Sequence, residues 1–441
     1  MIPWWLLAIV VFGTNFTLWG VIGLLRLLDS STWGWWSKSR APAPVDLDVS
    51  DVAVLIPAHN EEEVIVDSLN AITSLVPRQN VHVISDGSTD RTVELARRCG
   101  VNVISTATNV GKAGALHQGI RRFRLVERFE VVMLLDADTH VEPGYFRAAL
   151  PLFADPGVVA VAGCVRSTTD DSRLSQVGRL VAYHRQRIYT MTQYLLKFGQ
   201  TWRRVNATHI VPGFASLYRT AVLPEIEVNP PGLVIEDFNM TFEVYQKALG
   251  KVGFTPSAVA VTQEPGTFKD YVRQSKRWSL GLWQTVRLHP PKANLFTAML
   301  GLLLLELLSS SIMIVLLPLL LALLVIPEVF GSVAHLPVIG EVHAAVAAHL
   351  SLPVMLFGIV LPDLLLTCLV ALIQRRPRFL LYAPVFLFMR VLDAAISLYA
   401  LPQAWLARST GRWSSPGRRP VEATPQQPQQ VREPEPDLRA G

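Results

Sequence analysis

The sequence predicts an α/β domain with a mostly parallel sheet, placed between helices that cross a membrane. Between residues 50 and 265, short apolar runs alternate with helical segments, as in sheets whose parallel strands are joined by helices. Polar or glycine-rich stretches follow four consecutive predicted strands, where such sheets bind their ligands. The third observation concerns membrane-spanning length. Four apolar segments each exceed the roughly 20 residues needed to cross a bilayer, at 2–28, 295–326, 350–373 and 379–406.

Composition supports a membrane protein. The chain has 441 residues, of which 50% are hydrophobic, and a net charge of +5. Much of the basic excess lies beside the apolar segments, so we expect contact with anionic membrane lipid and no nucleic-acid partner. The three cysteines, Cys99, Cys164 and Cys368, show neither metal nor disulfide spacing.

The first apolar segment predicts an N-terminal transmembrane helix at residues 1–30. A signal peptide is the alternative, but the segment is long and has neither a basic start nor a small-residue cleavage site. Basic and aromatic residues in the linker at 31–49 predict that the following domain is cytoplasmic, by the positive-inside rule. We therefore expect a multi-pass protein of the plasma membrane.

The α/β domain is expected at residues 50–265. Apolar runs predict strands at 52–56, 81–85, 101–105, 131–135 and 158–162, with a further strand after residue 250. Helices are expected between them at 61–75, 91–98, 113–124 and 145–153, followed by a long helix at 172–198. Right-handed crossovers would then place the helices on both faces of the sheet.

Residues 266–292 predict an amphipathic helix at the membrane interface. Aromatic and aliphatic side chains alternate there with lysine and arginine, just before a long apolar run. A basic surface helix of the α/β domain is the alternative. The C-terminal membrane region is then expected at 295–406, as two or three helices.

Topology and charge leave two questions in this membrane region. Four crossings would return the basic C-terminus to the outside, so one segment is expected to be re-entrant or interfacial, and 379–406 contains Pro384 and Pro402. Intramembrane charges usually face protein or water. Arg390 and Asp393 either form a structural pair or, with Glu306 and Asp363, line a polar channel for a glycan.

The tail at 407–441 is rich in proline, glutamine and charge from residue 416 onward. Such a composition cannot bury a core, so we expect it to be disordered.

Two carboxylates follow the predicted strand at 131–135, in the sequence Asp136-Ala137-Asp138. Buried charges are costly unless they are paired or bound to a metal. Hard oxygen ligands at a strand end suit Mg²⁺ or Mn²⁺ holding substrate phosphates. A solvated turn is the alternative for this triplet alone.

The neighbouring strand ends indicate a nucleotide. IPAHNEE, SDGSTD and NVGKAGAL follow the first three strands, at 56–62, 85–90 and 109–116. Asp86 can accept hydrogen bonds from a base or ribose, and Lys112 offers a positive charge to phosphate. Neither a Walker A motif nor a dinucleotide-binding fingerprint is present. The pattern therefore favours a nucleoside diphosphate bound in another way.

Two later stretches would complete the site. Asp237, in the sequence Ile235-Glu236-Asp237, is a candidate general base, although an acidic pair that begins a helix can also be a simple cap. Gln274, Arg277 and Trp278 lie at i, i+3 and i+4 on the interface helix and so share one face. An arginine can clamp a diphosphate, and a tryptophan ring can stack on a sugar.

In this order the motifs resemble the membrane branch of the family-2 inverting glycosyltransferases, which have the GT-A fold and include cellulose, chitin, hyaluronan and poly-N-acetylglucosamine synthases. The resemblance spans about residues 52–283. It implies that a UDP-sugar is held by Pro57, Ala58, Asn60, Glu61, Asp86, Lys112, Asp136 and Arg277. It further implies a metal on Asp138, an acceptor beside Gly213, Glu236, Gln274 and Trp278, and Asp237 as the base.

Two positions depart from the family pattern. Ser85 stands where many members have aspartate, and Ile235 where many have threonine. We expect single-displacement transfer from UDP-N-acetylglucosamine or UDP-glucose, most simply by a processive polysaccharide synthase that uses Mg²⁺ or Mn²⁺. The alternative is a non-processive enzyme that adds one sugar to a lipid acceptor. A transporter or receptor with an inactive nucleotide domain is disfavoured by the intact acidic residues. We also include a small membrane partner subunit among the partners that this resemblance implies.

Overall fold

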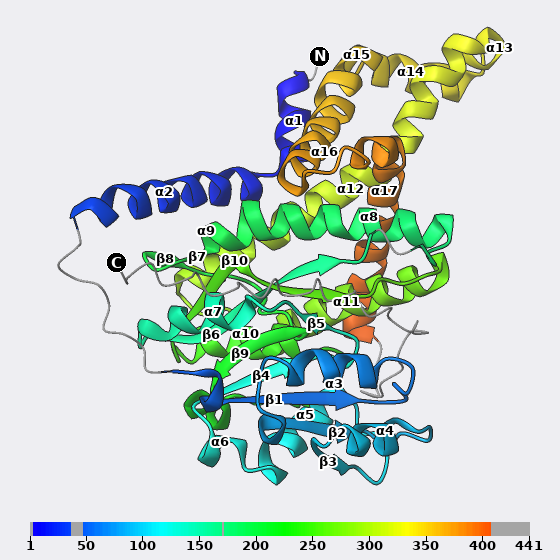
Figure 1. Ribbon diagram of the computed structural model, residues 1–441. Coiled ribbons are helices and arrows are strands. Elements are labelled where there is room, and N and C mark those ends of the chain that lie inside the picture. Colours follow the sequence, from blue (N-terminus) through cyan, green and yellow to red (C-terminus); the bar gives the residue numbers. More distant parts are fainter. Residues whose placement is uncertain (1–2, 37–46, 170–171, 407–441) are drawn as a thin grey trace, which may run out of the picture.

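The computed structural model describes residues 3–36, 47–169 and 172–406 (Figure 1). The 407–441 tail and most of the 31–49 linker lie outside these residues. The sequence-predicted strands and helices of the α/β domain are present, and their bounds shift by only a few residues. The strands are β1 (Val52–Ala58), β2 (Val81–Ser85), β3 (Asn102–Ser105), β4 (Val131–Leu135), β5 (His140–Val141), β6 (Val158–Ser167), β7 (Thr201–Trp202), β8 (Val205–Asn206), β9 (Ala215–Arg219) and β10 (Lys251–Thr262).

Within the described residues, an eight-stranded sheet forms the centre of the α/β domain, in the order β3-β2-β1-β4-β9-β6-β10-β5. The pairs β1–β2, β2–β3, β1–β4 and β6–β10 are parallel. Strand β9 is antiparallel to both β4 and β6, and β5 is antiparallel to β10. The sheet is therefore mostly parallel, as expected. Strand β9 itself was not predicted, because PGFASLYR lacks a long apolar run.

Helices cover both faces of the sheet, because side chains alternate along each strand. Val52, Val54 and Ile56 pack under one layer of helices, and Ala53 and Leu55 pack under the other. The first layer is α3 (Ile65–Thr73), α4 (Thr92–Arg98) and α7 (Tyr145–Ala149) with the 3₁₀ helix Leu150–Ala154. The second is α5 (Lys112–Arg122), α6 (Leu125–Arg128) and α10 (Glu236–Gln246).

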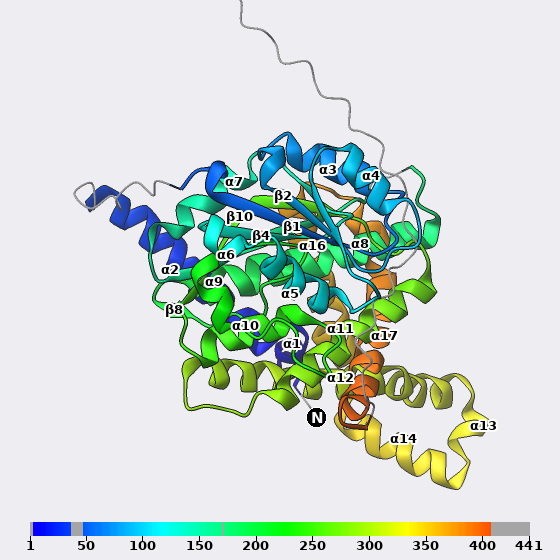
Figure 2. The same ribbon diagram turned by 90° about the horizontal axis from the view of Figure 1, so that it is seen from below.

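Two long helices lie between the α/β domain and the apolar helices (Figures 1 and 2). Helix α8 (Gln176–Met191) continues through a π-helical turn (Thr192–Lys197) into α9 (Phe198–Gln200), close to the long helix that the sequence predicted. Helix α11 (Phe268–Leu288) matches the expected amphipathic segment. Its N-cap residue, Thr267, accepts a hydrogen bond from the backbone N–H of Asp270, and this fixes the start of the helix.

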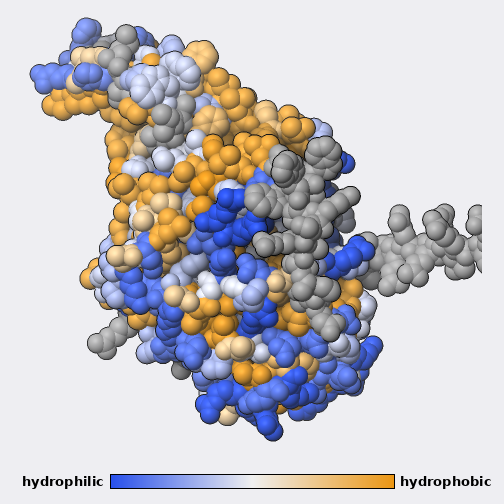
Figure 3. All heavy atoms as spheres, turned by 90° about the vertical axis from the view of Figure 1, so that its left-hand side faces the viewer, coloured by the Kyte–Doolittle hydropathy of each residue, from blue (hydrophilic) through white to orange (hydrophobic). Residues whose placement is uncertain are grey.

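Three helical segments among the described residues are long and apolar enough to cross a membrane: Leu295–Val329, Leu352–Gln374 and Phe379–Leu406. They correspond to α12, to α15–α16 with an intervening π-helical turn, and to α17. Figure 3 shows hydrophobic surface over the upper part of the molecule and hydrophilic surface below. The bounds are α12 (Leu295–Val329), α13 (Gly331–Ala334), α14 (Pro337–His349), α15 (Leu352–Met355), π-turn Leu356–Val360, α16 (Leu361–Gln374) and α17 (Phe379–Leu406).

The N-terminal apolar segment is not the single helix that we expected from residues 1–30. It forms α1 (Trp4–Phe12) and α2 (Thr14–Trp36), which are separated by Gly13 with a φ of +80°. Helix α2 turns away from α1 and runs along the top of the α/β domain (Figure 1). Among the described residues, neither helix belongs to the segments that could cross a membrane by length and composition.

The bend is explained by a carboxylate from α12. Glu306 Oε2 accepts hydrogen bonds from Asn15 N (2.8 Å) and Asn15 Nδ2 (2.9 Å), which satisfies a backbone donor at the start of α2. A Cβ at Gly13 would lie 2.3 Å from Glu306 Oε1 and would push this carboxylate away from Asn15, and the φ of +80° also favours glycine. Further along α2, Arg26 donates to the carbonyl oxygens of Phe198 (2.6 Å) and Phe254 (3.1 Å). These bonds hold α2 on the α/β domain.

Of the two alternatives for the intramembrane charges, the pair between Arg390 and Asp393 was wrong. Arg390 Nη1 lies 2.6 Å from Asp363 Oδ1, and Arg187 Nη2 of α8 reaches the same oxygen at 2.7 Å. Asp393 instead bonds to His184 of α8, at 2.9 Å. The sequence could not indicate these partners, because Arg187 lies 176 positions before Asp363 and His184 lies 209 positions before Asp393.

Candidate active site

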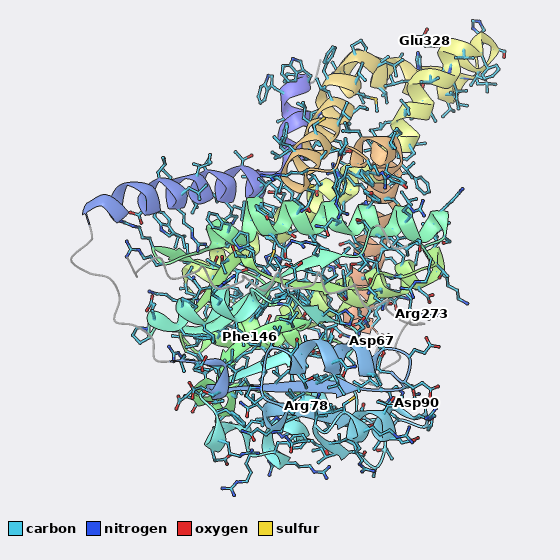
Figure 4. All side chains as sticks on the ribbon, viewed as in Figure 1. Asp67, Arg78, Asp90, Phe146, Arg273 and Glu328 are labelled. Carbon is cyan, nitrogen blue, oxygen red and sulfur yellow. The ribbon has the colours of Figure 1, made fainter. Side chains whose placement is uncertain are left out.

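The predicted site residues of the α/β domain lie where the parallel strands end. The arrowheads of β1 and β2 point to the side of the molecule where Figure 4 shows Asp67, Asp90 and Arg273, the last on α11. Strand β9 begins at this edge because it runs antiparallel to β4, and Leu135 pairs with Ala215. The PG turn before β9 therefore meets the aspartates that follow β4.

The loop after β1 is tied to the loop after β2. Pro57 and Ala58 end β1, and the carbonyl oxygen of Ala58 accepts a hydrogen bond from Asp86 N at 2.8 Å. Asn60 has a left-handed φ of +54°, and its Oδ1 accepts from Thr89 N at 2.9 Å. Glu61 is buried. The two loops are thus fixed relative to each other.

Asp86 is fully buried and holds a third loop. Its carboxylate accepts from the backbone N–H groups of Val110 and Gly111, both at 2.8 Å, and from Thr106 Oγ1 at 3.0 Å. These bonds place Lys112 at the first position of α5. In this structure Asp86 therefore shapes the loop, and its direct contact with a nucleotide stays a prediction.

Lys112 joins two acidic residues from different parts of the chain. Its Nζ lies 2.7 Å from Asp136 Oδ1 and 3.0 Å from Glu236 Oε1, and it is 3.3 Å from the carbonyl oxygen of Gly213. Burial alone would lower the pKa of Lys112, but the two carboxylates outweigh it and the pKa is raised above its usual value. The ammonium group is therefore charged at neutral pH.

Asp237 is half-buried beside this cluster, in the first turn of α10. Its carboxylate accepts from Phe238 N at 2.7 Å and from Gly213 N at 3.3 Å. Burial, and then the charge of Glu236, raise the pKa of Asp237 to about 6, although Lys112 acts in the opposite direction. A carboxylate with this pKa is ionised at neutral pH and is also a usable proton acceptor.

Asp136 and Asp138 fit a divalent cation by the chemistry of their donors. Asp138 is buried, whereas Asp136 is partly exposed and pairs with Lys112. Among the described residues, no group of three or more His, Cys, Asp or Glu side chains could hold a metal ion without other ligands. Mg²⁺ commonly takes only one or two carboxylates and completes its shell with water and substrate phosphates. The residues present are sufficient for that arrangement.

Of the three residues predicted to share one face of α11, Gln274 and Trp278 contact the same side chain, Arg185 of α8, and Arg277 does not. Gln274 Oε1 accepts from Arg185 Nη2 at 3.3 Å, and the Arg185 guanidinium lies 4.3 Å from the centre of the Trp278 ring. Arg277 makes no hydrogen bond or ion pair with the described residues. Arg185 was missed by sequence reasoning, although the run HRQR within the predicted 172–198 helix is an unusual charge cluster beside apolar segments.

Comparison with known proteins gives one family-level match. The model of the family described as glycosyltransferase like family 2 matches residues 50–281. Poly-beta-1,6-N-acetyl-D-glucosamine synthase of Staphylococcus aureus (strain COL) is 25% identical over 240 residues, which are 53% of this chain and 55% of that protein. The Staphylococcus epidermidis synthase is 24% identical over 253 residues, covering 54% and 58% respectively. The chain spans about half the length of the curated relatives it matches.

Solved structures with a detectable likeness include a mannosyltransferase and a glucosyl-3-phosphoglycerate synthase. The mannosyltransferase PcManGT from Pyrobaculum calidifontis, in complex with GDP-Man and Mn²⁺, has a TM-score of 0.47 and 20% identity, and covers 86% of this chain and 99% of that one. Glucosyl-3-phosphoglycerate synthase from Mycobacterium tuberculosis, in complex with phosphoglyceric acid, has a TM-score of 0.37 and 17% identity, with 55% and 85% covered. We base no assignment on these two structures, because both scores are low.

Proposed function

The chain belongs to glycosyltransferase family 2, since the family model covers more than half of its residues, and on this premise we propose that it transfers a sugar from a UDP-sugar with inversion at the anomeric carbon. The observation that carries the proposal is Asp237. Its carboxylate has a pKa of about 6 and lies beside the Lys112 cluster, at the edge of the sheet where donors bind. UDP-N-acetylglucosamine is the first candidate donor, because the curated relatives are named as poly-N-acetylglucosamine synthases. UDP-glucose is the second.

The chemical step is a single displacement. Asp237 takes the proton of an acceptor hydroxyl as its oxygen forms a bond to the anomeric carbon, and the bond from that carbon to the diphosphate breaks with its electron pair leaving on UDP. Lys112 supplies a fixed positive charge near the leaving diphosphate, and Arg277 is free of partners among the described residues to supply another. Preorganised charges of this kind stabilise the transition state more than the ground state.

A divalent cation would be held by Asp138 and Asp136 together with the diphosphate. When bound, Mg²⁺ or Mn²⁺ would neutralise charge on the leaving group. Asp136 Oδ1 lies 2.7 Å from Lys112 Nζ, so the ammonium group is next to a proposed metal ligand and would add positive charge near the diphosphate.

Placement of the acceptor favours a glycan that leaves through the membrane. We propose that Gly213, Glu236, Gln274 and Trp278 border the acceptor, since the first two contact the Lys112 cluster and the last two lie on α11. Helix α11 packs against α17 through Trp283, Ala400 and Ala404. An acceptor end at Trp278 would thus lie beside the apolar helices, which suits processive synthesis.

The location of the protein and its membrane segments follow from the proposed synthesis of a glycan. We propose a cytoplasmic catalytic domain at 50–265, an interface helix at 266–292 and a plasma-membrane region at 295–406. Helix α17 is the segment we propose as interfacial, because Arg287 of α11 donates to the carbonyl oxygen of Ala404 near its C-terminal end. A small membrane partner subunit stays a prediction from the resemblance alone.

Incubation of membranes with radiolabelled UDP-sugars tests the function. Membranes containing the protein, and matched membranes without it, are given UDP-N-acetylglucosamine or UDP-glucose, and the products are sized on a gel. We expect chains many sugars long from one of the two donors. If the product is a lipid that carries a single sugar, the protein is a glycolipid synthase and the proposal of polymer synthesis is wrong. No incorporation from any UDP-sugar would contradict the proposal.

A further inference from the structure

Arg185 of α8 is buried against one stripe of α11. Its Nη2 donates to Ser275 Oγ at 2.6 Å and to Gln274 Oε1 at 3.3 Å. Its guanidinium lies 4.5 Å from the centre of the Tyr271 ring and 4.3 Å from that of Trp278. These four residues are at i, i+3, i+4 and i+7, the spacing of one helix face. A single arginine therefore contacts two turns of α11, including Gln274 and Trp278 of the predicted acceptor face.

The charge of Arg185 is balanced from the α/β domain. Glu264, two residues after β10, has Oε2 at 4.0 Å from Arg185 Nε. Glu264 Oε1 accepts from Ser167 Oγ, at the end of β6, at 2.8 Å. A continuous polar path thus runs from the carboxyl end of β6 through Glu264 and Arg185 to Gln274. Because Arg185 is only 4% exposed, its bonds are formed away from bulk water and are hard to replace.

We propose that Arg185 is a positioning residue that fixes the Trp278 ring and the Gln274 amide for the acceptor, an inference that rests on the proposed function. The cation covers one face of a half-buried indole ring, which leaves the other for a sugar. Arginine suits this place better than lysine, since a planar guanidinium can stack on an aromatic ring and donate at its edge at once. Arg185 itself touches neither donor nor reacting atoms in this assignment.

The alternative is that Arg185 is only a buried packing residue of α8. Arg187 provides the matched control, because it is on the same helix, is 1% exposed and pairs with Asp363 of α16, while no bond of it to α11 is seen among the described residues. A general loss of packing or of a buried cation should affect Arg185→Met and Arg187→Met alike.

The test compares full-length Arg185→Met, Arg187→Met, Trp278→Ala and the double variant Arg185→Met/Trp278→Ala in detergent. Each is assayed with UDP-N-acetylglucosamine and, separately, UDP-glucose, for UDP release without transfer and for product length on a gel. For Arg185→Met we expect transfer to fall about tenfold while UDP release without transfer stays within about threefold, the size of a lost cation–π contact and its hydrogen bonds. In the Trp278→Ala background, Arg185→Met should lower transfer by less than a further factor of about two, because the ring that Arg185 positions is absent.

Three outcomes would overturn the proposal. Equal loss of transfer and UDP release, as expected of Arg187→Met, would make Arg185 a packing residue. If the loss of transfer in the double variant equals the product of the losses in Arg185→Met and Trp278→Ala, Arg185 does not act through the Trp278 ring. If Arg185→Met is not recovered as a monodisperse protein, Arg185→Lys keeps the charge and takes its place in the same comparison. A wild type that turns over neither donor would refute the function itself, and with it the role of Arg185.

Discussion

Replacement of Asp237 by asparagine should remove the base and leave the fold and the donor site almost unchanged. The side chain keeps its shape, and its Oδ1 can still accept from Phe238 N at 2.7 Å. The hydrogen bond from Gly213 N, at 3.3 Å, would face an amide nitrogen and be lost, at a cost of about 0.5–1.5 kcal/mol. The repulsion from Glu236 would disappear at the same time, so the free energy of unfolding should change by only about 1 kcal/mol.

The rate should fall far more than the stability. A positioned base is worth about 10²–10⁴ in rate, so Asp237→Asn should lower transfer by that factor. With a pKa of about 6, the wild type should lose activity below pH 6 by about tenfold per pH unit, because the protonated acid cannot take a proton. Residual activity of Asp237→Asn should lack this acid limb.

Glu236→Gln is the matched control. It removes one of the charges that raise the pKa of Asp237, so the acid limb should move to lower pH and the base should remain. The assay is initial transfer from radiolabelled UDP-sugar between pH 5 and 8, with UDP affinity measured by calorimetry. An Asp237→Asn variant with near-normal turnover, or one with the wild-type acid limb, would remove Asp237 from the role of base.

Four further outcomes are expected. Excess EDTA should abolish transfer and added Mg²⁺ or Mn²⁺ should restore it, and Asp138→Ala should weaken UDP-sugar binding in metal by calorimetry; full activity in EDTA would contradict the metal site. Trp278→Ala should shorten products on a gel far more than it slows UDP release without transfer, whereas equal slowing would make the ring a simple anchor. Gly13→Ala should lower the melting temperature in detergent by several degrees, because a Cβ would lie 2.3 Å from Glu306 Oε1 and the residue has positive φ; an unchanged melting temperature would show that the bend is not constrained. Deletion of residues 416–441 should leave transfer within a few-fold, and a dead but inserted truncation would refute this.

Sequence patterns predicted the parallel half of the sheet because its strands are buried on both faces. Strand β4 is a continuous apolar run, and β2 (VHVIS) is fully buried although His82 interrupts its apolar residues; the bounds of both strands match the prediction. Strand β9 was missed because Ser216 and Tyr218 interrupt its apolar pattern. It is nevertheless buried between β4 and β6, where tertiary pairing outweighs the weak local signal.

The sequence indicated which residues of the α/β domain lie at the candidate site, but it did not indicate which partners their side chains contact. Motif order brought Lys112, Asp136 and Asp237 to one edge, since strand ends in such a sheet meet there. The partner of each charge depended on distant segments. Nothing local indicates that Glu236 meets Lys112 more than 120 positions earlier, or that Arg185 contacts Trp278.

The shared carboxylate of Asp363 bears on how the protein can be handled. Its Oδ1 pairs with both Arg187 of α8 and Arg390 of α17, while Asp393 of α17 bonds to His184 of α8. A soluble fragment that ends before α12 would keep the buried α8 residues and lose both of their acids. It would also expose Tyr183 and Met191 of α8, which pack against apolar residues of α16 and α17 in the intact chain, and large exposed apolar patches favour aggregation. Expression trials that trim the chain at the membrane boundary should therefore yield aggregates, and structural work needs the intact chain in detergent or lipid.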